Sequence, residues 1–121
     1  MINKMPDSNN GGSPDDFVHF RLADLKRKLG NEPSSYHSFI EKPSLKAGLY
    51  YLEKGTSDPQ QPHELDEIYY IISGRSGFVA GNESKEVRPG DILYVRAHLE
   101  HKFVDIEEDL VVLVFFSAFK R

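Results

Sequence analysis

The amino-acid sequence predicts an all-β sandwich or barrel with one short helix near the N-terminus. From residue 36 onward, short runs rich in β-branched and aromatic residues alternate with Gly, Pro, Ser and Asp, which is the pattern of short strands joined by turns. One earlier segment spaces its leucines as a helix does. Strands and helices do not alternate as they do in parallel sheets, so we expect antiparallel pairing.

The N-terminal region divides into a tail and a helix. Residues 1–14 are polar and rich in Asn, Gly, Ser and Pro, so they cannot bury enough apolar surface to offset the entropy lost on ordering, and we expect a flexible tail. Leu22, Leu25 and Leu29 recur at helical spacing and stop at Gly30. This spacing predicts one short helix that ends there.

A single domain is expected over residues 15–121, with the barrel core at about residues 36–119. A chain of 121 residues without cysteine can bury one core without disulfides. The final run is apolar on both faces, so one face can fill the core while the other needs cover. We expect a homodimer to provide that cover, with the N-terminal helix as the alternative. The predicted strands are residues 36–40, 49–52, 68–72, 77–80, 92–95, 101–104 and 110–116.

Composition and charge exclude several classes of function. The net charge is −4 and both signs are interspersed, whereas a nucleic-acid-binding protein usually has a basic face. No segment approaches the roughly 18 apolar residues that cross a bilayer, and the first 14 residues lack the apolar region of a signal peptide. The absence of cysteine excludes thiolate metal ligands and fits a reducing compartment. We expect a cytoplasmic protein that binds neither nucleic acid nor membranes.

The polar residues that suggest chemistry lie in residues 61–70 and 96–103. Gln61, His63 and Glu67 have the same parity, so in an unbroken strand they share a face. At about 3.3 Å per residue, however, His63 and Glu67 would lie roughly 13 Å apart. Metal–ligand bonds are only about 2 Å long, so both residues meet one ion only if the chain bends between them. The sequence by itself does not show this bend, although residues 64–66 are a plausible place for it.

The first of these segments resembles the first signature of the cupin superfamily. That signature runs Gly, five residues, His, one residue, His, three residues, Glu, six residues, Gly. Gly55, His63, Glu67 and Gly74 fall at these spacings, and Gln61 stands where the first His is expected.

The second segment resembles the second cupin signature, which runs Gly, five residues, Pro, one residue, Gly, two residues, His, three residues, Asn. Gly90 and His101 match it, while Arg96, His98 and Asp105 replace the Pro, the Gly and the Asn. The two signatures lie in register at a separation typical of compact microbial cupins.

The resemblance implies a jelly-roll-like cupin barrel that binds one divalent transition metal. Its ligands would be His63, Glu67 and His101, with Gln61 as a fourth; the alternative is that Gln61 does not ligate and a water takes that position. Two imidazoles and a carboxylate suit Mn, Fe, Ni or Zn and leave positions open for a small-molecule ligand. An amide oxygen from Gln61 would favour the harder ions Mn(II) and Fe(II).

The functional prediction is a small metalloenzyme that acts on a small carbonyl, carboxylate or phenolic compound. Isomerase, decarboxylase, lyase and dioxygenase chemistry all occur on the fold that the resemblance implies, so the fold does not choose among them. The alternative is a non-catalytic, metal-dependent module that binds or senses a small molecule. His98 is a candidate general acid or base at the pocket mouth; its other interpretation is an ordinary loop histidine.

Overall fold

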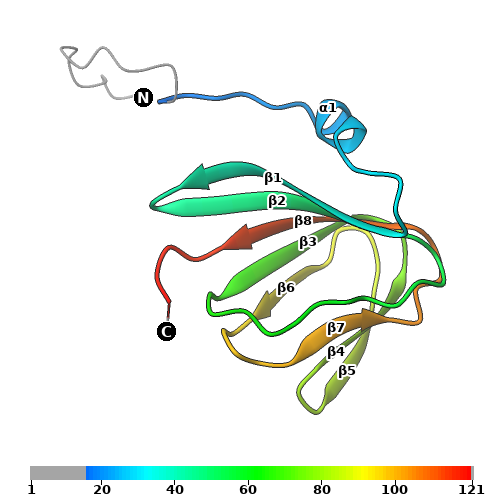
Figure 1. Cartoon of the computed structure of the whole chain (residues 1–121). Helices are drawn as coiled ribbons and strands as arrows, with labels where there is room; N and C mark the ends of the chain where they lie inside the picture. The colour runs from blue at the N-terminus through cyan, green and yellow to red at the C-terminus, as the bar shows by residue number, and fades with distance from the viewer. Residues whose placement is uncertain (1–15, 121) are drawn as a thin grey trace, which may run out of the picture.

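The computed structural model describes residues 16–120, which form two antiparallel sheets packed face to face (Figure 1). The larger sheet has five strands in the order β1-β2-β8-β3-β6, and the smaller has three in the order β5-β4-β7. This arrangement confirms the all-β prediction, while the predicted tail over residues 1–14 lies outside the described residues. The elements are α1 (Leu22–Arg27), β1 (Ser34–Lys42), β2 (Leu45–Leu52), β3 (Glu67–Ser73), β4 (Ser76–Ala80), β5 (Glu83–Val87), β6 (Ile92–Val95), β7 (His101–Val104) and β8 (Leu110–Phe116).

The core lies between the two sheets and follows from the alternation of each strand. Along β3, Glu67, Tyr69 and Ile71 are buried, whereas Ile68 and Tyr70 face outward. The inward side chains pack on those of the facing sheet, and the largest fully buried ones include Tyr69, Phe103, Leu52 and Leu110. The polar residue Glu67 therefore sits at the edge of an apolar interior, in line with Tyr69.

The strand β5 was not among the predicted strands, and its sequence explains why. Its residues 83–86 are all exposed, and Val87 alone is buried. The strand pairs with β4 at the edge of the smaller sheet. An edge strand with two solvated faces needs no alternation of apolar residues, so residues 81–84 look like a turn in the sequence.

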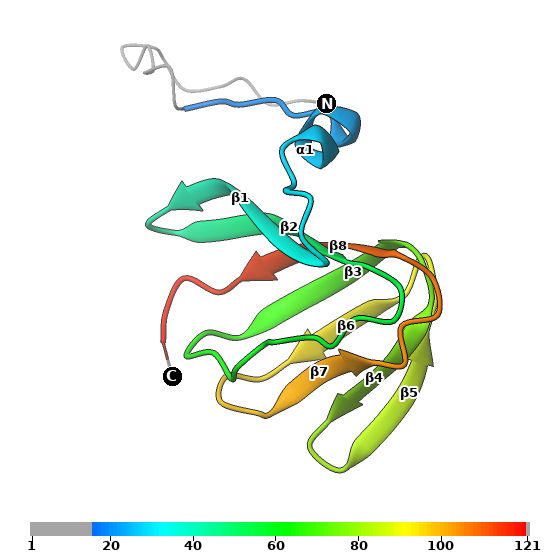
Figure 2. The same cartoon turned by 45° about the vertical axis from the view of Figure 1, so that its right-hand side comes forward.

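The helix α1 covers part of the outer face of the larger sheet. In both views it lies beyond β1 and β2, on the side away from β4, β5 and β7 (Figures 1 and 2). Its Leu25 is buried with Leu49 and Val111, so the helix provides some of the cover that β8 needs. The six-residue α1 is far too short to cross a bilayer, and no other helix in residues 16–120 could do so.

The outer face of β3 and β6 carries exposed apolar side chains that α1 does not reach. Ile68, Tyr70, Ile92 and Tyr94 are each at least 40% exposed. The register places Ile68 opposite Tyr94 and Tyr70 opposite Ile92, so the four side chains form one continuous patch. We call these four residues the outer patch.

Gly74 fixes the turn between β3 and β4. Its φ is 95°, and a Cβ built there would overlap the Asp109 carbonyl oxygen. Any other residue would have to move the backbone that enters β8. Glycine is therefore required at position 74, the last glycine of the first signature, because the Asp109 backbone lies too close for a side chain.

Candidate metal centre

His63, Glu67 and His101 come together at one end of the barrel. Glu67 is the first residue of β3, His101 is the first residue of β7, and His63 lies in the loop between β2 and β3. Glu67 and His101 are buried, and His63 is partly exposed. One ligand atom from each residue lies within 4.8 Å of the others. The fold thus brings residues from both signatures into one site, which spacing along a single strand would not do.

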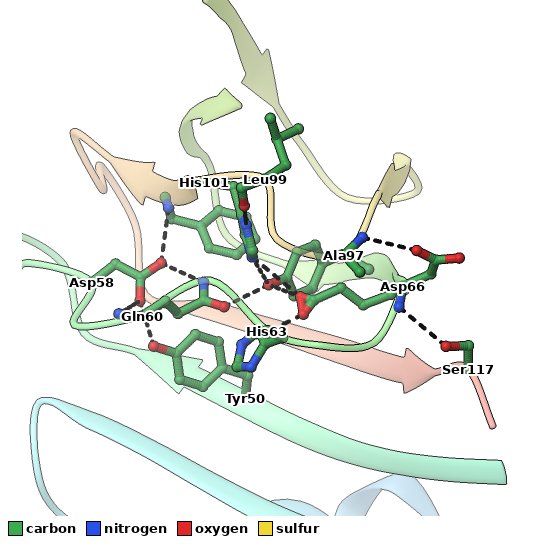
Figure 3. A network of polar contacts seen from close by, with 12 residues as sticks. Tyr50, Asp58, Gln60, His63, Asp66, Ala97, Leu99, His101 and Ser117 are labelled. Carbon is green, nitrogen blue, oxygen red and sulfur yellow. Dashed lines mark hydrogen bonds and ion pairs between the residues drawn. The ribbon is translucent and has the colours of Figure 1, made fainter. Parts of the chain in front are cut away.

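The bend between His63 and Glu67 lies at residues 64–65, after which β3 begins. Asp66 stabilises this bend through hydrogen bonds to Ala97 and Ser117. Its Oδ1 accepts the Ala97 N–H at 2.8 Å, its N–H donates to Ser117 Oγ at 3.1 Å, and its carbonyl accepts the Ser117 N–H at 2.9 Å. The segments that follow β6 and β8 thus hold the bend between the candidate ligands His63 and Glu67 (Figure 3).

The residue His98 supports the same loop through its backbone. Its N–H donates to the His63 carbonyl at 2.7 Å, and its φ of 71° lies in the left-handed region. Its side chain is exposed and does not line the cavity beside His63 and Glu67. The predicted acid–base role of His98 stays a prediction, while its backbone has a direct structural role.

The ring of His101 is oriented by its own loop. Nδ1 lies 2.6 Å from the Leu99 carbonyl oxygen, and because a carbonyl only accepts, Nδ1 carries the hydrogen. Nε2 therefore faces the site, 3.2 Å from Glu67 Oε1. Burial lowers the pKa of His101, but hydrogen bonds to Glu67 and the Leu99 carbonyl, together with the charge of Glu67, outweigh it and raise the pKa overall.

The two carboxylate oxygens of Glu67 differ in their hydrogen-bond partners. Oε1 accepts the Tyr69 hydroxyl at 2.6 Å. Among the buried side-chain N and O atoms of residues 16–120, Glu67 Oε2 alone has no hydrogen-bond partner; it lies 3.6 Å from His63 Nε2. A buried carboxylate oxygen without a donor is costly, and a cation beside it would remove that cost. The residues present therefore fit a metal ion.

A buried carboxylate that the sequence analysis missed lies behind the cluster. Asp58 is 6% exposed and accepts the Tyr50 hydroxyl at 2.5 Å and the Phe103 N–H at 2.9 Å. It also accepts from Gln60, through the backbone N–H at 3.2 Å and through Nε2 at 2.6 Å. Figure 3 shows Asp58 and Gln60 beside His101 and Tyr50. Neither residue stands at a ligand position of the cupin signature, so the resemblance that selected Gln61 passed over both.

The two neighbouring glutamines face different surroundings. Gln60 Oε1 accepts the Tyr69 hydroxyl at 2.6 Å, and Gln60 lines the cavity that contains His63 and Glu67. Gln61 is exposed and does not line that cavity; it lines a second one, of about 290 Å³, whose wall also includes Gln60 and His101. Ligation by Gln61 remains a prediction, and it requires the side chain to turn inward.

A cavity of about 200 Å³ opens beside the cluster. Aromatic rings from β1, β2, β3 and β8 form most of its wall, and no Lys or Arg is among the described residues that line it. Gly48 leaves the room that the Tyr36 hydroxyl occupies, since a Cβ there would overlap that oxygen. Burial and the nearby charge of Glu67 raise the pKa of Tyr36 to about 12. The lining includes Tyr36, Tyr50, His63, Tyr69, Val114 and Phe116.

Comparison with known proteins identifies the class to which this fold and site belong. The profile of the cupin domain matches residues 48–116, more than half of the chain, and the chain therefore belongs to the cupin family. This match confirms the resemblance seen in the two signatures. An uncharacterized protein of Streptomyces coelicolor is 42% identical over 98 residues, which cover 81% of this chain and 93% of that protein.

Solved structures with the same fold include enzymes. The structure of KdgF from Halomonas sp. is 25% identical, covers 73% of this chain and 81% of its own, and has a TM-score of 0.65. The salicylate 1,2-dioxygenase of Pseudoaminobacter salicylatoxidans, solved with gentisate, has a TM-score of 0.73 at 14% identity. The alignment covers 82% of this chain but 33% of the dioxygenase chain, so the likeness extends to the fold alone.

Proposed function

We propose that the chain binds one divalent transition metal through His63, Glu67 and His101. The observation that carries this proposal is the buried Glu67 Oε2, which lacks a hydrogen-bond partner among the described residues and lies 3.6 Å from His63 Nε2. The fixed tautomer of His101 supports it, because the donation from Nδ1 to Leu99 leaves the Nε2 lone pair for an ion.

The donor set limits the metal to a few ions. Two imidazoles and one carboxylate suit Mn, Fe, Ni and Zn, and leave coordination positions open. Gln61 belongs to the proposal as the weakest ligand, since its neutral amide oxygen would have to turn in from the surface. A bound metal of this kind would supply Lewis-acid chemistry toward a substrate oxygen.

We further propose that the protein is a small metalloenzyme that acts on a small carbonyl, carboxylate or phenolic compound. A cavity of about 200 Å³ admits only a small molecule. Tyr36 and Phe116 would hold its apolar part and exclude water, while the Tyr36 hydroxyl would orient a polar group. No Lys or Arg lines this cavity among the described residues, which disfavours compounds with several negative charges.

The metal proposal is tested by elemental analysis of protein purified without an affinity tag, followed by titration with Mn(II), Fe(II), Ni(II) and Zn(II). We expect about one ion per chain, strongly reduced in His63→Ala and His101→Ala. His19→Ala, which removes an exposed histidine remote from the cluster in sequence, is the matched control. Gln61→Ala should weaken binding less than His63→Ala. Absence of stoichiometric metal after reconstitution with all four ions would disprove the proposal.

The enzyme proposal needs a ligand screen on the metal-free and metal-loaded protein. We expect a small carbonyl, carboxylate or phenolic compound to stabilise only the loaded form and then to be converted. A compound that binds the loaded form without conversion, in repeated assays across the reaction classes, would favour a binding or sensing module instead.

We also propose a homodimer that forms through the outer patch, because α1 leaves its four side chains exposed. Light scattering during gel filtration should give twice the chain mass of 13.8 kDa. Ile92→Lys should shift the protein to the monomer, whereas Lys85→Ala on the edge strand β5 should not. A monomeric wild-type protein at micromolar concentration would contradict this assembly.

A further inference from the structure

We propose that Gln60 and Asp58 are positioning residues of the metal centre, which hold the Tyr69 hydroxyl hydrogen away from Glu67 when an ion is bound. The inference rests on the proposed metal binding but concerns residues at variable positions of the first signature, which the signature does not specify. It assigns a function to Gln60, the glutamine next to the one that the signature selects.

The Tyr69 hydroxyl has one hydrogen and two acceptors at the same distance. Gln60 Oε1 and Glu67 Oε1 each lie 2.6 Å from the Tyr69 oxygen. A single O–H can donate fully to only one of them. The hydroxyl therefore has two alternative orientations, and the choice decides whether a hydrogen lies against the carboxylate.

Asp58 determines which end of the Gln60 amide faces Tyr69. Gln60 Nε2 donates to Asp58 Oδ2 at 2.6 Å, so Oε1 must be the end that faces Tyr69. A flipped amide would place its oxygen against a carboxylate. Asp58 is itself held from two strands, by Tyr50 on β2 and the Phe103 N–H on β7. These contacts to β2 and β7 therefore fix the position of Gln60 Oε1, the acceptor beside Tyr69.

An ion bound to Glu67 changes the balance between the two acceptors. Tyr69 donates to Oε1, whereas the oxygen left for an ion is Oε2. A hydrogen bond at Oε1 draws electron density from the whole carboxylate and makes Oε2 a weaker ligand, so donation from Tyr69 to Glu67 opposes metal binding. Gln60 offers the hydrogen a second acceptor that leaves the hydroxyl satisfied and buried. Without Gln60, the buried hydroxyl would have to donate toward the ligands themselves, since His101 Nε2 is its remaining neighbour at 3.1 Å.

The proposal is tested with the affinity for Mn(II), followed through the electron paramagnetic resonance signal of the free ion. Gln60→Met, which keeps an unbranched side chain but removes the amide, should weaken binding on the order of tenfold. Gln61→Met should have a smaller effect, and Lys85→Ala, on the exposed edge strand β5, should leave the affinity unchanged. An unchanged Mn(II) affinity in Gln60→Met would overturn the assignment.

A double-mutant cycle separates positioning from general destabilisation. In a Tyr69→Phe background there is no hydroxyl hydrogen to place, so adding Gln60→Met should change the Mn(II) affinity by less than about twofold. An undiminished effect of Gln60→Met in that background would show that Gln60 does not act through Tyr69. Circular dichroism of each variant checks that it is folded.

A crystal structure of the Zn(II)-loaded wild-type protein tests the inference without any variant. Tyr69 should remain within hydrogen-bond distance of Gln60 Oε1, with Gln60 still held by Asp58. Displacement of Gln60 from Tyr69 in the loaded protein would disprove the positioning role. Failure of the wild type to bind Mn(II) or Zn(II) would instead disprove the proposed function, so the two failures are distinguishable.

Discussion

His98 adopts a backbone conformation that suits glycine, at the position where the second signature has glycine. Its φ is 71°, and its N–H is bonded to the His63 carbonyl. Residues with a Cβ lose roughly 1–2 kcal/mol in this region, although histidine tolerates it better than most. The backbone is therefore under strain beside His63, a proposed metal ligand.

We predict that His98→Gly is more stable than His98→Ala by roughly 1 kcal/mol. Both variants lack the imidazole, so their difference isolates the effect of the Cβ at positive φ. Urea denaturation of the metal-free proteins measures it, and equal stabilities would contradict the strain. Once a substrate is known, turnover of fully metallated His98→Gly tests the predicted acid–base role, which unchanged turnover would exclude.

The pH dependence of stability should have opposite signs in the metal-free and metal-loaded protein. The raised pKa of His101 means that protonation stabilises the metal-free fold; this contribution is complete below the ordinary pKa of about 6.5 and is lost as the pH rises through the raised value. Metal binding needs the deprotonated ring and therefore strengthens over the same interval. The proton and the metal ion therefore compete for Nε2 of His101.

We therefore predict that the increase in melting temperature caused by a fixed Mn(II) concentration is larger at about pH 8 than at about pH 5.5. Differential scanning fluorimetry in matched buffers measures the increase. His19→Ala should follow the wild type, whereas His101→Gln should lose most of the increase at both pH values. An increase that shrinks as the pH rises would contradict the competition.

The candidate ligands could be selected from the sequence, but their neighbours could not. Spacing alone left His63 and Glu67 roughly 13 Å apart, and the family resemblance was needed to join them. The signature favoured Gln61 over Gln60, but residues 53–66 form a loop, where the strand parity that Gln61 shares with His63 and Glu67 does not hold. Asp58 gave no signal, because the Tyr50 and Phe103 donors that hold it lie far away in the sequence.

At the scale of elements, the runs of apolar residues predicted every strand except β5, which contributes only Val87 to the core. They missed β5, whose exposed residues carry no periodic pattern. The strand order β1-β2-β8-β3-β6 could not be predicted from the sequence either. The pairing of β2 with β8 depends on contacts between segments about 60 residues apart. Periodicity indicates which face of a strand is buried, but not which strand lies beside it.

The attachment of α1 to the barrel depends mainly on Leu25. This side chain is buried with Leu49 and Val111, whereas Leu22 is 40% exposed. We predict that Leu25→Ala destabilises the protein by about 2 kcal/mol, at the low end for a buried leucine, and that Leu22→Ala stays within about 0.5 kcal/mol. Urea denaturation gives both values. Mn(II) affinity should not change, because α1 lies on the outer face of the sheet; a loss of affinity would contradict this separation.

At the scale of the whole molecule, the core is a source of stability separate from the proposed metal centre. The buried apolar cluster includes Leu52, Ile71, Phe103 and Leu110, and its packing does not depend on a metal ion. Small zinc domains differ, since they lack such a core and unfold without the ion. A bound metal ion would therefore add stability to a fold that already exists.

We predict that a chelator lowers the melting temperature but leaves one cooperative transition. By mass action, free ion at 100 times its dissociation constant contributes about 2.7 kcal/mol, and removal of the ion loses only that part. Thermal denaturation followed by near-ultraviolet circular dichroism measures the transition. A metal-free protein that is unfolded at 25 °C would show that the core is insufficient.

The hydrogen bonds of Asp66 and of the His98 backbone have a consequence for the thermodynamics of ion uptake. They hold the ligand loop to β6 and β8 in the metal-free protein, so the entropy of ordering that loop is lost during folding. Ion binding then orders little chain and covers little apolar surface, and such a process has a heat-capacity change near zero. Calorimetric titrations at several temperatures should therefore give nearly constant enthalpies, as expected of a rigid receptor.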